Sequence, residues 1–143
     1  MIRILVRNIL ATIAGLFVGS CVNMALVLLN AYVLFPMPEG TDMNDQAQML
    51  AWIGTLPTAA FLVVVAAHLG QAFVGGWLAA RLSASKPMIP ALVVGVLTLV
   101  GGVVNMVALP GPAWMWIEVP LYLIVSFAAG KMEEKRRAAI SVG

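Results

Sequence analysis

Four long apolar runs, each uncharged or nearly so, constrain this chain more than any other feature of its sequence. They cover residues 9–35, 57–80, 88–109 and 113–130. A helix that rises 1.5 Å per residue needs about 17–25 apolar residues to cross the hydrocarbon of a bilayer. The runs are too long and too evenly apolar for the alternating strands of a membrane barrel. We therefore predict an all-α fold, a four-transmembrane-helix bundle that forms a single integral membrane domain over residues 1–143.

Composition excludes a soluble globular domain. The 143 residues are 62% hydrophobic and 10% charged, and the mean hydropathy is +1.02. A soluble domain is typically about 45–50% apolar and about 25% charged. The charged side chains of this sequence are too few to cover a surface that faces water.

The positions of the basic residues predict how the chain is oriented in the membrane. All eight Lys and Arg residues lie before the first run, between the second and third runs, or after the fourth run. The two remaining connections, residues 36–56 and 110–112, contain no Lys or Arg. Because basic residues near a span resist translocation, the segments that carry them stay in the cytoplasm. We predict a multi-pass protein of the bacterial inner (plasma) membrane with both termini cytoplasmic.

The first connection carries a signal for a short extra helix. The stretch PMPEGTDMNDQ at 36–46 begins with turn residues, and Thr41 or Asp42 is a candidate N-cap. The sequence then becomes more apolar towards Trp52. We predict a helix over about 42–55 that lies on the outer surface of the membrane, and a lid over a binding site is the alternative.

A heptapeptide in the first run resembles a lipoprotein cleavage site. VGSCVNM at 18–24 would place Cys21 at the lipidated position. However, fourteen further uncharged residues follow Cys21, up to Phe35, whereas the apolar part of a cleavable signal has about 7–15 residues. We therefore interpret the run as a membrane span and expect Cys21 to be a small buried residue.

The same heptapeptide has a near copy in the third run. VGGVVNM at 100–106 shares five of its seven residues with VGSCVNM, and both segments are predicted to run from the cytoplasm outwards. In the second and fourth runs, His68 and Glu118 each lie thirteen residues before a basic residue. These matches favour two parallel helical-hairpin repeats. Chance similarity between apolar segments is the alternative.

Helical periodicity gives each predicted span one face of small or polar residues. At 100° per residue these faces would point into the bundle, because polar groups in lipid need partners and small residues allow close packing. The candidate polar seam consists of Asn23, Asn30, His68, Gln71, Asn105, Glu118 and Tyr122. The candidate packing residues are Gly15, Gly19, Gly75, Gly76, Gly95 and Gly102. We expect an outward-opening polar pocket above a tightly packed inner half.

Each polar residue also has a purely structural interpretation. The asparagines would form hydrogen bonds between helices, His68 would be neutral with one partner, and Glu118 would reach the outer interface. The functional interpretation is a His68–Glu118 pair that acts as a proton switch, since a nearby carboxylate stabilises the imidazolium.

Three motifs resemble the small four-helix inner-membrane proteins that are common in bacterial genomes. They are PMPEGTD at 36–42, TLP at 55–57 and GGWLAAR at 75–81. The resemblance covers most of the chain, and it implies the four-helix fold without implying an activity. The residues themselves form no catalytic triad, metal-ligand cluster or phosphate-binding loop. We therefore expect no enzyme activity, catalytic residue, metal, cofactor or nucleic-acid partner.

Two classes of function remain. The first is transport or permeation of a small solute, ion or proton through the polar pocket. The second is a non-catalytic accessory or assembly subunit of a larger membrane complex. Four short spans enclose little volume, so we expect a homo-oligomer or a larger complex, with contacts through the small-residue pairs Gly15/Gly19 and Gly76/Ala80.

Overall fold

The computed structural model describes residues 1–142, and these residues form helices and connecting loops without strands. The elements are α1 (Ile2–Leu29), the π-helical turn η1 (Asn30–Leu34), α2 (Gln46–Ile53), α3 (Thr58–Leu82), α4 (Met88–Ala108), the 3₁₀ turn η2 (Ala113–Ile117) and α5 (Glu118–Val142). The segments Ile2–Leu34, Thr58–Leu82, Met88–Ala108 and Ala113–Ser141 are long and apolar enough to cross a membrane. The all-α class with four candidate spans is therefore confirmed, and these helices indicate a multi-pass membrane protein.

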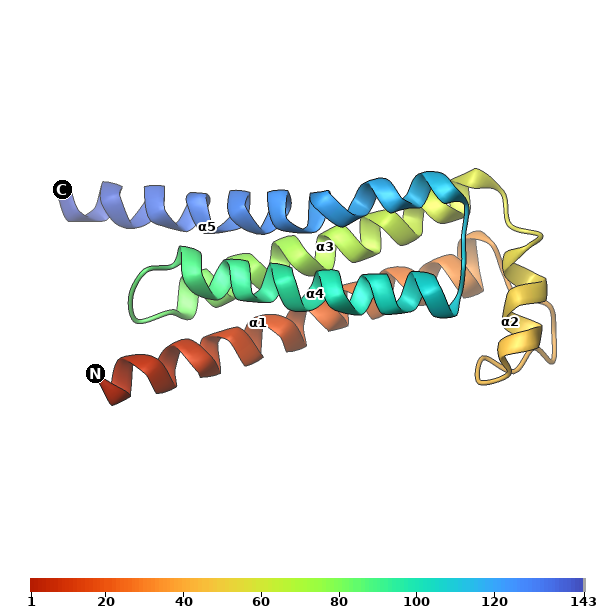
Figure 1. Ribbon diagram of the computed structural model, residues 1–143, viewed down its shortest axis with the longest axis horizontal. Helices are drawn as coiled ribbons and strands as arrows, with labels where there is room; N and C mark the ends of the chain where they lie inside the picture. The colour runs from red at the N-terminus through yellow and green to blue at the C-terminus, as the bar shows by residue number, and fades with distance from the viewer. Residues whose placement is uncertain (143) are drawn as a thin grey trace.

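The four long helices lie side by side, with both termini at one end of the bundle (Figure 1). We call this end, which also carries residues 83–87, the terminal end, and the opposite end, which carries α2, the α2 end. Helix α3 contacts each of the other long helices. Helix α1 packs mainly against α3 and to a lesser extent against α4, whereas α5 packs against both α3 and α4. Helix α1 is therefore at the edge of the bundle.

Helix α1 begins at Ile2, well before the apolar run that starts at residue 9. Two polar residues of this first part hold the end of α3 and the loop after it. The Arg7 Nε donates to the Leu82 carbonyl at 3.0 Å, and the Asn8 Oδ1 accepts from the Ala84 amide at 2.9 Å. These two bonds tie the start of α1 to the end of α3 and to the loop after it.

The small-residue faces pack the helices closely, as in other membrane bundles. Gly15 of α1 and Gly75 of α3 face each other, and a Cβ on either would overlap the other's carbonyl oxygen. A Cβ on Gly19 would lie 2.5 Å from the Gln71 carbonyl oxygen, and one on Gly95 would lie 2.7 Å from the Ser126 Cβ. These glycines therefore set the distances between helices of one chain.

Two expectations about which small residues are exposed are wrong. Gly15, Gly19, Gly76 and Ala80 are buried between helices of a single chain, so they do not supply a contact between copies. Cys21 is exposed rather than buried. It lies two residues after Gly19, about 200° further around the helix, and therefore points away from α3.

The proposed repeat is matched by one pair of residues and not by another. Asn23 and Asn105, equivalent in the two heptapeptides, line the same cavity. Gly19 is buried against α3, whereas its equivalent Gly101 is exposed and a Cβ there would meet nothing within 4 Å. The repeat stays a prediction.

Helix α2 is capped by Asp45, not by Thr41 or Asp42. The Asp45 Oδ1 accepts hydrogen bonds from the backbone amides of Ala47 at 2.9 Å and Gln48 at 3.2 Å. Its Oδ2 accepts from the Gln48 side chain at 2.9 Å. Asp42 instead accepts from the Asn44 amide at 2.8 Å, which makes it part of the turn before the helix.

We predict that acid uncaps α2. Hydrogen bonds from Gln48, the backbone amide first, lower the pKa of Asp45 below its ordinary value of 3.8. A lowered pKa means that the cap stabilises α2 above the ordinary value and is lost as the pH falls through the lowered one. Hydrogen-exchange protection of the Ala47 and Gln48 amides should therefore fall severalfold in that range. In Asp45→Asn, which caps without titrating, the protection should not follow pH. An identical loss in this variant would contradict the assignment.

Candidate functional site

A cavity of about 450 Å³ lies towards the α2 end of the bundle. Its walls come from α1, η1, α3, α4, η2 and α5, and Met49, Trp52 and Ile53 of α2 lie over it. Helix α2 therefore covers much of the end through which the sequence predicted the pocket to open. The polar residues of the walls are Asn23, Asn30, His68, Gln71, Thr98, Asn105 and Tyr122. The cavity thus brings together every residue of the predicted polar seam except Glu118.

Glu118 lies behind the cavity wall, where it pairs with His68. The His68 Nδ1 is 3.0 Å from the Glu118 Oε1, and both side chains are buried. The two residues are fifty positions apart, in α3 and at the start of α5. With a proton on Nδ1, the ring donates to the carboxylate and keeps Nε2 free for a second proton. The structure thus forms the pair that the functional interpretation requires.

Tyr122 is a third member of this group. Its hydroxyl donates to the Glu118 Oε1 at 3.4 Å, and its ring stacks on the His68 ring with the centroids 6.3 Å apart. Gly102 of α4 makes room for the hydroxyl, because a Cβ at this position would overlap it. His68 of α3 and Tyr122 of α5 therefore line the cavity, and the Glu118 carboxylate contacts both of them from behind.

The backbone helps to explain why an acid is tolerated here. Glu118 follows the 3₁₀ turn η2 and occupies the first turn of α5. The amide groups at a helix N-terminus carry a partial positive charge that favours a carboxylate. Even so, the Glu118 Oε2 is buried and has no hydrogen-bond partner within residues 1–142. The carboxylate therefore keeps one free acceptor.

Asn23 and Asn30 each form a hydrogen bond to α3 through the side-chain amide nitrogen. The Asn23 Nδ2 donates to the Gln71 Oε1 at 2.8 Å, and the Asn30 Nδ2 donates to the Ala60 carbonyl at 3.2 Å. The Oδ1 atoms of Asn23 and Asn30 are buried without a partner among the described residues. Asn30 also begins the π-helical turn η1, a feature frequent at functional sites. Asn105 is an exposed residue of the cavity wall.

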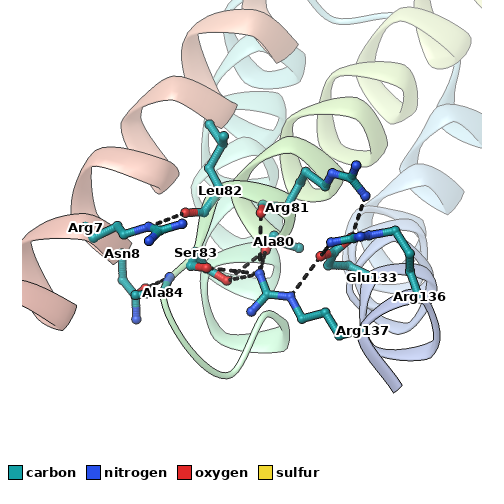
Figure 2. Close-up of polar contacts among 10 residues, drawn as sticks. All are labelled: Arg7, Asn8, Ala80, Arg81, Leu82, Ser83, Ala84, Glu133, Arg136 and Arg137. Atoms are coloured by element: carbon teal, nitrogen blue, oxygen red, sulfur yellow. Dashed lines mark hydrogen bonds and ion pairs between the residues drawn. The ribbon is translucent and has the colours of Figure 1, made fainter. Parts of the chain in front are cut away.

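A second polar cluster, centred on Glu133, lies at the terminal end (Figure 2). The Glu133 side chain has 0% exposure and lies beside three arginines. Arg136 approaches it to 2.6 Å, Arg137 to 2.8 Å and Arg81 of α3 to 3.5 Å. The cluster therefore joins α5 to the end of α3.

Arg137 also caps the end of α3. Its Nη2 donates to the Ala80 carbonyl at 2.7 Å and to the Ser83 carbonyl at 3.0 Å. Ala80 lies in the last turn of α3 and Ser83 follows the helix directly, at the end where helix carbonyls lack partners within the helix. In the sequence, the basic residues indicated only the orientation of the chain, and Glu133 was not among the predicted site residues. The spacing of Glu133 to Arg136 and Arg137, three and four residues, is a signal that could have indicated it.

None of the protein-family models, curated proteins or solved structures compared with this chain matches it. The resemblance to small four-helix bacterial membrane proteins therefore stays a prediction. The function has to be argued from the cavity and its chemistry.

Proposed function

We propose that this membrane protein transports a small solute, ion or proton, with the cavity as its binding site and the His68–Glu118 pair as its proton carrier. The observation that carries the proposal is a buried imidazole–carboxylate pair whose histidine lines a cavity, together with two asparagines of the same cavity wall that have unpaired amide oxygens. Ionisable residues inside a membrane are expensive to bury and commonly mark transport pathways. The proposed role is binding and translocation, not catalysis.

The chemistry of the pair suits a proton carrier. With a neutral imidazole, the pair carries the single negative charge of Glu118. A proton that arrives through the cavity binds the His68 Nε2 and forms an imidazolium, so the pair becomes neutral overall. Because an uncompensated charge is unfavourable in a low-dielectric interior, binding and release of this proton change the stability of the surrounding packing. Tyr122, a further titratable group, contacts both members of the pair through its hydroxyl and its ring.

The shape of the bundle supports access from one side at a time. The cavity lies towards the α2 end, whereas Gly15 and Gly75 close the α1–α3 contact nearer the terminal end. A site that is closed on one side fits alternating access, in which the two sides open in turn. We place the terminal end in the bacterial cytoplasm, because the basic residues gather there. We further propose a homo-oligomer, as expected from the sequence.

The test is proton movement through proteoliposomes that contain a pH-sensitive dye. Glu118→Gln and His68→Ala should each reduce proton uptake at least tenfold, because a positioned proton carrier contributes roughly 10²–10⁴-fold to proton transfer. Glu134→Gln, which alters an exposed acid at the terminal end, should behave as the unmodified protein. Variants that elute normally from a sizing column and keep full uptake would rule out the proton-carrier role.

An accessory role in a larger complex is the second candidate. The observation that favours it is the position of α1 at the edge of the bundle, with Ile13 56% and Phe17 69% exposed. Another subunit could cover this face instead of lipid. Purification from the native membrane separates the two functions: an isolated, stable oligomer favours transport, and larger subunits in fixed ratio favour the accessory role.

A further inference from the structure

Two asparagines of the cavity wall carry buried hydrogen-bond acceptors that have no partner. The Asn30 side chain is only 3% exposed, and its Oδ1 lacks a partner among the described residues, as does the Oδ1 of Asn23. Both residues line the cavity. Buried acceptors without partners lower stability, and a ligand that donates hydrogen bonds would remove this penalty.

The charges around the cavity narrow the choice of ligand. None of the lining residues of the described chain is a lysine or arginine. The nearest ionisable groups are His68, Tyr122 and, behind them, the Glu118 carboxylate. A phosphate or carboxylate head would meet unpaired oxygens with no cation to balance it, which is unfavourable in an apolar site. An ammonium or hydroxyl head would instead find acceptors.

The rest of the wall suits an apolar body. It is mostly apolar and includes Val27, Trp52, Phe61, Val64 and Met106. A volume of about 450 Å³ is within the range of roughly 300–1,000 Å³ for pockets that hold small organic molecules. The cavity therefore matches a molecule with one polar end and an apolar remainder.

The opening of the cavity faces sideways, between α1 and α4. Met24 of α1 and Leu97 of α4 line the cavity and are 57% and 48% exposed, so they form part of its rim, together with exposed Gly101. Met24 lies ten residues before the end of η1 at Leu34, about 15 Å along the helix. This depth is within the apolar span. At the α2 end, the Gln46 Nε2 holds α2 over α4 by donating to the Ala108 carbonyl at 3.0 Å.

We infer that the cavity binds an apolar molecule with a hydrogen-bond-donating head, a hydrophobic amine or alcohol, which enters from the bilayer between α1 and α4. The inference rests on the cavity being a ligand site, as the proposed function states. It adds the chemical class of the ligand and its route of entry.

Binding is measured with the protein in lipid nanodiscs, with pyrenemethylamine, pyrenemethanol and pyrenecarboxylate as matched probes. Energy transfer from tryptophan to pyrene reports occupancy, because Trp52 lines the cavity, and empty nanodiscs give the partition of each probe into lipid. The amine and the alcohol should each bind at least about tenfold more tightly than the carboxylate. Their heads donate hydrogen bonds to the buried acceptors, whereas the carboxylate is repelled by them. Tighter binding of the amine identifies a cationic ligand, and equal binding identifies a neutral donor. Equal or tighter binding of the carboxylate overturns the inference.

Two variants test the location. Gly101→Phe should plug the rim without disturbing the helix, because a Cβ there meets nothing within 4 Å, and it should weaken amine and alcohol binding at least about tenfold. Val100→Phe, at a neighbouring exposed position outside the cavity, should leave binding unchanged. Asn30→Leu should abolish the preference for donor heads. Equal effects of the two phenylalanine variants would overturn sideways entry.

The binding and proton assays separate this inference from the transport proposal. Probe binding with the expected preference, without proton uptake, leaves the inference standing and overturns the proton-carrier role of the His68–Glu118 pair. Proton uptake that depends on Glu118, with no probe binding above that of empty nanodiscs, overturns the inference and leaves transport standing.

Discussion

Gly15→Ala is expected to lower the free energy of unfolding by about 1–3 kcal/mol, the usual effect of overpacking a close contact. The new Cβ would overlap the Gly75 carbonyl oxygen and lie 2.9 Å from the Ala79 Cβ. Because the obstacle is backbone of α3, no side-chain rotation relieves it, and α1 must move away. Denaturation by SDS in mixed lipid–detergent micelles measures the loss.

Gly101→Ala is the matched control for Gly15→Ala. It adds the same methyl group to another membrane span, α4, at a position where a Cβ would meet nothing within 4 Å. Its stability should be unchanged, or higher by up to about 1 kcal/mol, since alanine favours helix more than glycine. Gly75→Ala should resemble Gly15→Ala, and the double variant should lose less than the sum because both act on one contact. Equal stabilities of Gly15→Ala and Gly101→Ala would contradict the packing of α1 on α3.

Glu133→Gln is expected to have the second large effect. It should lower the free energy of unfolding by roughly 1.5–3 kcal/mol, the usual contribution of hydrogen bonds to a charged group. The substitution keeps the size of the side chain and removes the negative charge beside Arg81, Arg136 and Arg137. The three arginines are 31–42% exposed, so solvent screens part of their repulsion and keeps the loss below that of a fully buried pair. Because Arg137 also caps α3, we expect the terminal end to loosen first.

Glu134→Gln tests whether burial matters. Glu134 pairs only with Lys131, at 2.7 Å, and the two side chains are 36% and 49% exposed. Exposed pairs of this kind contribute about 0–1 kcal/mol. Thermal unfolding of both variants, together with hydrogen exchange at residues 79–83, would show the difference. If the Glu133 variant is as stable as the Glu134 variant, the Glu133 cluster does not stabilise the contact between α5 and the end of α3.

The number and type of the spans could be predicted because uncharged runs of this length leave the backbone few other solutions in lipid. Helical phase also grouped the polar residues on shared helix faces, since the angle around a helix axis depends only on sequence position. All of these residues except Glu118 line the cavity. The same reasoning failed for Cys21, which was assigned to the interior by residue type alone and is exposed. Residue type is a weaker guide to burial in a membrane, where apolar side chains face lipid as readily as the core.

The sequence by itself determined the helices, their apolar lengths and their small or polar faces, because these depend on local hydrogen bonding and periodicity. Tertiary structure alone decided that His68 meets Glu118, that Glu133 is enclosed by arginines of two helices, and that Gly19 is buried while Gly101 borders a cavity. The physical reason is geometric. Periodicity gives the direction in which a side chain leaves its own helix, whereas a contact also needs the rotation, offset and distance of the neighbouring helix, which the packing of all four helices sets together.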